Sequence, residues 1–119
     1  MRRAALLVIS AALLAASPAL AAEANFALDL EGTMGTPYDV LCDVTHADGT
    51  TARLVYAGGP PRLYEFQATT AHCHIFKEPS VGVLTAQLLM EKSLVASTSL
   101  GEGPGEAILA SGGAAPEGK

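Results

Sequence analysis

Alternation of apolar and polar side chains is the feature that most constrains what this chain can fold into. Phe26, Leu28 and Leu30 are each separated by one residue, and the residues between them are small or acidic. Comparable alternation recurs in three later runs, over residues 38–45, 51–57 and 62–70. Successive side chains of a β-strand point to opposite faces of its sheet, so these runs predict half-buried strands.

Turn signals separate the runs. Asp48-Gly49 is a strong hairpin signal, for which we expect a positive φ at both positions, and Gly58–Pro61 combines two residue types that end strands. Seven or eight short strands, spaced about ten residues apart, are typical of an antiparallel β-sandwich. We therefore expect a single all-β sandwich domain over residues 22–110, followed by a disordered tail over residues 111–119.

Residues 81–92 fit two structures. Leu84, Leu88 and Glu91 have the spacing of one helix face, but the same segment also alternates passably as a strand. We favour a hairpin that turns at residues 91–93, because Gly82 weakens a helix start and the following segment is rich in serine, threonine and valine. The helix remains the alternative.

The first 21 residues have the anatomy of a secretory signal peptide. Arg2 and Arg3 precede an apolar run over residues 4–16, and an A-x-A cleavage sequence follows at residues 19–21. The run is shorter than the roughly 20 residues of a membrane-spanning helix, which disfavours a retained anchor. We expect a bacterial Sec-type leader cleaved after Ala21, and a mature protein that is periplasmic or secreted without a stable membrane anchor.

The mature chain is acidic. Residues 22–119 carry five lysines and arginines against twelve aspartates and glutamates, a net charge of −7 with neutral histidines. An acidic surface repels phosphates, so nucleic acid and anionic bilayers are poor partners. The chain has no tryptophan, so a stacking platform for bases or sugars is thinly supplied. The expected partner is an unknown protein or a small ligand.

Cys42 and Cys73 are the two cysteines of the chain, and they lie 31 positions apart. Two cysteines in an oxidising compartment usually pair. We therefore expect a Cys42–Cys73 disulfide, which would stabilise the fold by roughly 3–4 kcal/mol if it acts by restricting the unfolded chain. Two free thiols are the alternative.

Two histidines flank the second cysteine in the sequence AHCHIFKE. If this stretch is a strand and Cys73 faces the core, His72, His74 and Phe76 share the opposite face. These three side chains form a candidate binding patch.

A metal site is a second interpretation of the same stretch. Histidines at positions i and i+2 of a strand lie roughly 7 Å apart, and His72 and His74 could therefore bind one ion. Glu78 or His46 would supply a third ligand. Two solvated surface histidines are the simpler interpretation.

The stretch also resembles a copper-ligand motif of the multicopper oxidases, H-C-H-I-x-x-H-x-x-x-G. Residues 72–75 and Gly82 match this motif in register. The resemblance would imply copper ligation, but the third histidine of the motif falls on Glu78, and the chain has room for only one of the family's repeated cupredoxin domains. We carry over neither copper nor any other cofactor.

The sequence contains no nucleophile elbow, P-loop or dinucleotide-binding fingerprint. We therefore expect no enzyme but a small exported binding or accessory protein, which contacts its partner through the patch at His72, His74 and Phe76 or through the loops Gly32–Pro37 and Gly58–Pro61. Two alternatives remain open. One is a periplasmic metal binder that uses His72 and His74. The other is a secreted inhibitor whose acidic charge suits a basic enzyme.

Overall fold

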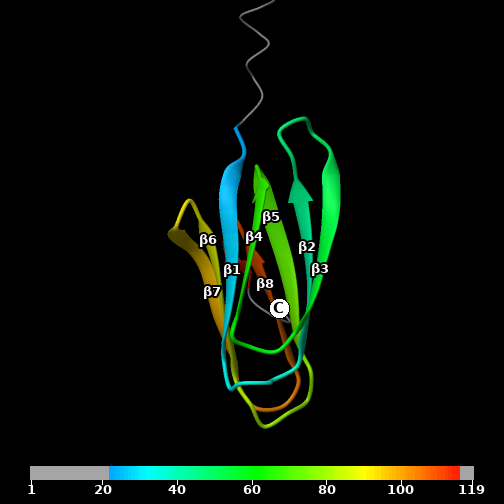
Figure 1. The fold of residues 1–119 in the computed structure, drawn as a ribbon, viewed down its shortest axis with the longest axis vertical. Helices are drawn as coiled ribbons and strands as arrows, with labels where there is room; N and C mark the ends of the chain where they lie inside the picture. Colours follow the sequence, from blue (N-terminus) through cyan, green and yellow to red (C-terminus); the bar gives the residue numbers. More distant parts are fainter. Residues whose placement is uncertain (1–21, 116–119) are drawn as a thin grey trace, which may run out of the picture.

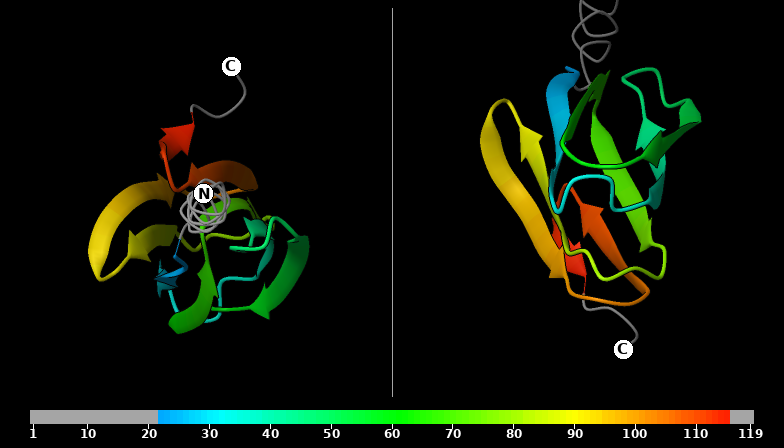
Figure 2. Two further views of the ribbon diagram at one scale, coloured as in Figure 1. Left: turned by 90° about the horizontal axis from the view of Figure 1, so that it is seen from above. Right: turned by 60° about the horizontal axis from the view of Figure 1, so that its bottom comes forward.

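Two antiparallel sheets pack face to face in the computed structural model, which describes residues 22–115 (Figure 1). The first sheet has the strand order β4-β1-β6-β7 and the second has the order β3-β2-β5-β8-β9. The strands are β1 Ala24–Gly32, β2 Tyr38–Thr45, β3 Thr51–Gly58, β4 Arg62–Ala68, β5 Thr70–Lys77, β6 Leu84–Met90, β7 Ser93–Leu100, β8 Gly105–Ala110 and β9 Gly113–Ala115. The arrangement confirms the predicted all-β sandwich, and Figure 2 shows its two layers from two further directions.

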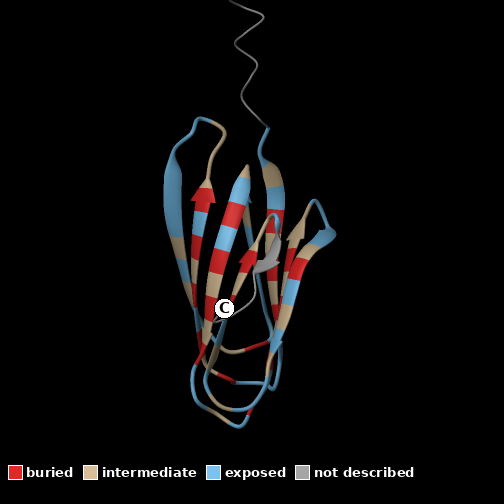
Figure 3. Cartoon of the chain, turned by 180° about the vertical axis from the view of Figure 1, so that it is seen from behind, coloured by how far each residue is buried: buried red, intermediate tan, exposed pale blue. Residues whose placement is uncertain are grey.

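The core lies between the two sheets and is built from every second residue of the strands. Buried and exposed bands alternate along the strands in Figure 3. Phe26, Leu28 and Leu30 of β1 are no more than 2% exposed, as their spacing predicts. The other fully buried large side chains come from both sheets: Tyr38, Val40, Val44, Ile75, Leu84, Leu88 and Leu109.

The predicted disulfide is present in the centre of the second sheet. Cys42 of β2 lies directly opposite Cys73 of β5, with an S–S distance of 2.03 Å and a Cα–Cα distance of 4.0 Å. Both side chains point into the core and have no exposed surface. The bond therefore joins neighbouring strands of one sheet. It is consistent with an oxidising location outside the cytoplasm.

The turn between β2 and β3 differs from the expected one. Gly49 has a positive φ of 90°, but Asp48 does not, so the expectation of two positive φ values was wrong. The Gly49 amide donates to the His46 carbonyl oxygen, and the His46 amide donates to the Thr50 carbonyl oxygen. This three-residue loop needs only one left-handed position. The Asp48 carboxylate instead accepts hydrogen bonds from the amide and the hydroxyl of Thr50.

Residues 84–90 form strand β6, so the hairpin interpretation of this segment is confirmed. Glu91 and Lys92 are the two turn residues, with φ values of 52° and 68°, and Met90 pairs with Ser93 across the turn. Two consecutive positive φ values define the turn type whose twist matches that of the flanking strands. The helical spacing was misleading, because Leu84 and Leu88 also lie on one face of a strand.

Replacing Lys92 by glycine is expected to raise the free energy of unfolding by about 0.5–1 kcal/mol, because glycine adopts a positive φ without a steric penalty. Urea unfolding followed by circular dichroism measures the change. Lys92→Ala is the matched control, since it removes the charge but keeps the unfavourable φ. A glycine variant no more stable than the alanine variant would contradict the explanation.

A signal peptide and a disordered tail were predicted at the two ends of the chain. The signal peptide assigned to residues 1–21 lies outside the described residues. Within the segment expected to be a disordered tail, Gly113–Ala115 pairs with β8 as the short strand β9, whereas residues 116–119 lie outside the described part. Among residues 22–115 there is no helix with the length and apolarity needed to cross a membrane.

Candidate functional site

The three residues of the candidate patch lie together on the outer face of β5. Their side chains alternate with those of Cys73 and Ile75, which are fully buried. His72 is exposed, and His74 and Phe76 are half-buried. The structure therefore confirms that both histidines point away from the disulfide, as the alternation of a strand requires.

Apolar side chains from three neighbouring strands extend this patch. His74 pairs with Leu41 of β2 on one side and with Ile108 of β8 on the other, and Leu41 pairs in turn with Val55 of β3. Val55 is 64% exposed, and Leu41 and Ile108 are half-buried. A row of apolar residues thus crosses the outer face of the sheet, with one histidine in the row. We call this surface the histidine face; its residues are Leu41, Val55, His72, His74, Phe76 and Ile108.

His74 makes two side-chain contacts on the histidine face. Its ring stacks on that of Phe76, with ring centroids 4.1 Å apart. Its Nε2 atom lies 2.7 Å from the Oε1 atom of Glu106 on β8. The two contacts fix the position of the imidazole beside Phe76, whose ring is half-buried.

A charged pair borders the histidine face beside His72. The Arg53 guanidinium donates two hydrogen bonds to the Asp43 carboxylate, at 2.8 and 3.2 Å. Asp43 lies between Arg53 and His72 in the strand register. These hydrogen bonds from Arg53 lower the pKa of Asp43, so the carboxylate stays ionised in mildly acidic solution. The border of the face therefore carries an exposed pair of opposite charges.

The structure does not bring a third metal ligand to the two histidines. Among residues 22–115, no group of three or more histidine, cysteine, aspartate or glutamate side chains could hold a metal ion. Glu78 follows the end of β5 and is exposed, and the Nδ1 atom of His46 lies 3.1 Å from a Glu23 oxygen. We therefore base no proposal on metal binding by His72, His74 and Glu78.

The two loops named from the sequence lie together at the lower end of the sandwich in Figure 1, where the Gly35 amide donates to the Pro60 carbonyl oxygen. Two more loops, residues 78–83 and 101–104, join them through backbone hydrogen bonds. The Thr33 amide donates to the Val83 carbonyl oxygen, and the Gly103 amide donates to the Ser80 carbonyl oxygen. The ammonium group of Lys77, which is only 2% exposed, donates to the carbonyl oxygens of Ser80 and Gly103. We call these four loops the loop end. It exposes three apolar side chains at its surface: Met34, Val81 and Val83.

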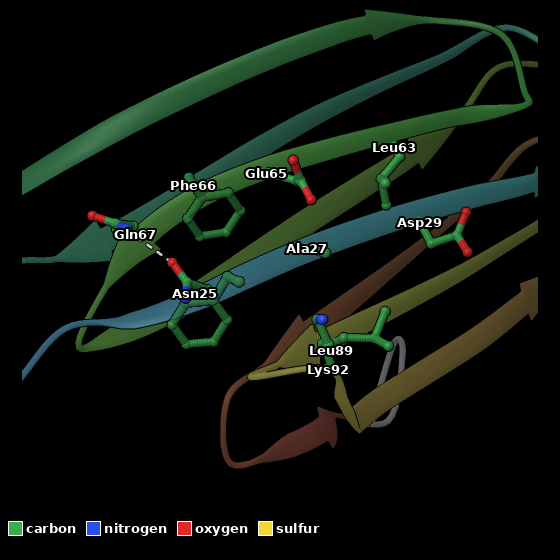
Figure 4. A pocket seen from close by; sticks show the side chains of 10 residues that line it. Asn25, Ala27, Asp29, Leu63, Glu65, Phe66, Gln67, Leu89 and Lys92 are labelled. Carbon is green, nitrogen blue, oxygen red and sulfur yellow. Dashed lines mark hydrogen bonds between the residues drawn. The ribbon is translucent and has the colours of Figure 1, made fainter.

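Sequence reasoning missed a concavity on the outer face of the other sheet. It has a volume of about 620 Å³ and lies over β1, between β4 and β6 (Figure 4). Ala27 forms its floor, and Glu65 and Leu89 are the register neighbours of Ala27 on the two sides. We call it the alanine hollow. A small residue between two larger ones produces the hollow, but only the strand register shows which residues are neighbours.

Comparisons with known proteins return no match to a family model, a curated protein or a solved structure.

Proposed function

We propose that the protein is a small exported binding or accessory protein without catalytic activity, which contacts a protein partner through the histidine face. The observation that carries this proposal is the apolar row across the outer face of the second sheet. Val55 in this row is 64% exposed. A sheet face that contacts only solvent usually carries polar residues at such positions.

The two central strands of the histidine face, β2 and β5, are joined by the Cys42–Cys73 disulfide on their buried side. Cys73 lies between His72 and His74 in β5, and its disulfide fixes β5 to β2. A contact surface that is rigid before binding loses little conformational entropy when the partner arrives. Aromatic side chains such as Phe76 are enriched at the centre of protein–protein interfaces.

The charge of the chain indicates the chemistry of the partner. Asp39 and Glu106 lie beside Phe76 in the strand register, and the mature chain has a net charge of −7. A matching surface would be apolar at its centre and basic at its border. A basic enzyme inhibited by this protein is one partner of that chemistry.

The experiment is affinity capture from the exported fraction of the native host with the purified protein as bait, followed by mass spectrometry. We expect Val55→Asp and Phe76→Ala to abolish capture of the partner that the unmodified protein retains. Leu94→Asp is the matched control, because Leu94 is 55% exposed and lies on β7 of the opposite sheet. Unfolding midpoints of all variants show whether each has kept its fold.

The proposal fails if the histidine-face variants capture the same protein as strongly as Leu94→Asp does. It also fails if the captured partner has an acidic surface and its binding is unaffected by the two substitutions. Loss of capture by Leu94→Asp alone would place the contact on the other sheet.

A further inference from the structure

The alanine hollow is a second concave surface, separated from the histidine face by the full thickness of the sandwich. Its apolar lining includes Ala27 on the floor, with Leu63 of β4 and Leu89 of β6 on either side of β1 (Figure 4); Phe26 and Phe66 also contribute to the lining. Leu63 is 58% exposed. At one end, the amide group of Gln67 donates to the Asn25 side-chain oxygen at 2.8 Å and closes the hollow. The result is a short apolar trough of a size that suits a small ligand.

Two carboxylates border this trough. Asp29 follows Ala27 on the same face of β1, and Glu65 lies directly opposite Ala27 on β4. Within residues 22–115, neither carboxylate forms an ion pair with a lysine, arginine or histidine. Lys92 is the one basic residue in the lining, and it comes from the turn after β6.

Negative charge accumulates further along the same strand. The Asp29 carboxylate raises the pKa of Glu31 through a side-chain hydrogen bond and charge repulsion. Two neighbouring carboxylates that repel each other gain stability when a cation binds between or beside them. The outer face of this sheet therefore combines an apolar trough with carboxylates at its rim that form no ion pair within residues 22–115.

We propose that the alanine hollow binds a cationic aliphatic group, namely an ammonium or guanidinium on an alkyl stem. The stem lies over Ala27 between Leu63 and Leu89. The cationic end reaches the carboxylates of Asp29 and Glu65. A free alkyl amine and a lysine or arginine side chain of another polypeptide both have this chemistry. The site is independent of the histidine face and can be present whether or not that face binds a protein.

The test is a titration of the ¹⁵N-labelled protein with n-hexylammonium chloride, followed by amide chemical shifts at physiological salt. We expect saturable shifts centred on Ala27, Glu65 and Leu89, and weaker binding of n-hexanol by at least about fivefold. Hexanoate should not bind, because it places a negative charge beside two carboxylates. Nα-acetyl-lysine methylamide in a parallel titration distinguishes the two sources: tighter binding of this compound indicates a polypeptide side chain, and tighter binding of hexylammonium indicates a free amine.

Three substitutions examine the geometry. Ala27→Leu fills the trough and should abolish the shifts, whereas Glu65→Gln should weaken binding by about three- to fivefold, as expected for a partly exposed ion pair. Lys92→Ala removes the competing positive charge and should strengthen binding. The proposal is overturned if hexanol binds as well as hexylammonium, or if Ala27→Leu leaves the affinity unchanged. Val55→Asp, on the histidine face, should have no effect on this titration.

Discussion

Replacing Cys42 and Cys73 together by alanine is expected to lower the free energy of unfolding by about 3–4 kcal/mol. The two residues are separated by 31 positions, so the bond restricts a long segment of the unfolded chain. A domain of this size is usually stable by about 5–15 kcal/mol, so the loss is a large fraction of the total. Equilibrium unfolding in urea measures it.

The effect should act mainly through the unfolded state, because the native strands remain paired without the bond. Val40, Cys42 and Val44 of β2 keep their partners on β5 through backbone hydrogen bonds. The far-ultraviolet spectrum of the double variant should therefore match that of the oxidised protein. Reduced unmodified protein is the control and should unfold at nearly the same urea concentration as the variant. A loss below about 1 kcal/mol would contradict the loop-entropy explanation.

Most of the fold could be predicted from the sequence because strand alternation is a local signal. The spacing of Phe26, Leu28 and Leu30 needs no knowledge of the partner strands to indicate which face is buried. The disulfide was predicted on different grounds, namely the presence of two cysteines in a chain expected to be exported to an oxidising compartment. Segment 81–92 was harder, since its leucines satisfy a helix and a strand alike. The hairpin turn at Glu91-Lys92 shows that the segment is a strand, but the sequence does not signal this turn, because neither residue commonly adopts a positive φ.

The candidate sites depend on register, which the sequence does not reveal. The shared face of His72, His74 and Phe76 follows from one strand alone and was predicted. Leu41 and Val55 join that face because β2 and β3 are its neighbours in one particular alignment. The alanine hollow has no sequence signal at all: Ala27 is an ordinary small residue until Glu65 and Leu89 are placed on either side of it.

Replacing Gly32 by alanine is expected to lower the free energy of unfolding by about 2–4 kcal/mol. Gly32 is the last residue of β1 and has a φ of 134°, a value that residues with a side chain rarely adopt. A Cβ atom there would lie 2.3 Å from the carbonyl oxygen of Val83 and 3.1 Å from the Cα atom of Leu84. Both contacts are with backbone, which cannot move aside as a flexible side chain can.

Substitutions at two other glycines separate the cost of the positive φ from the cost of the steric contact with Val83. Gly35 has a φ of 81° but open space around it, so Gly35→Ala should cost only the backbone penalty of about 1–2 kcal/mol. Gly101 has open space and is not among the positive-φ glycines, so Gly101→Ala should change stability by less than about 0.5 kcal/mol. Equal losses for Gly32→Ala and Gly35→Ala would show that the contact with Val83 is unimportant.

The Gly32 substitution should also loosen the loop end locally. The Val83 carbonyl oxygen that the new methyl group would crowd accepts a hydrogen bond from the Thr33 amide at 3.0 Å. Hydrogen exchange at the Thr33 amide should therefore accelerate more in Gly32→Ala than in Gly35→Ala, even after the difference in global stability is taken into account. The histidine face lies on the other sheet, away from this contact, so partner capture through it should survive in conditions where the variant remains folded. A variant that stays folded but loses the partner would instead place part of the contact surface at the loop end, around Met34 and Val83.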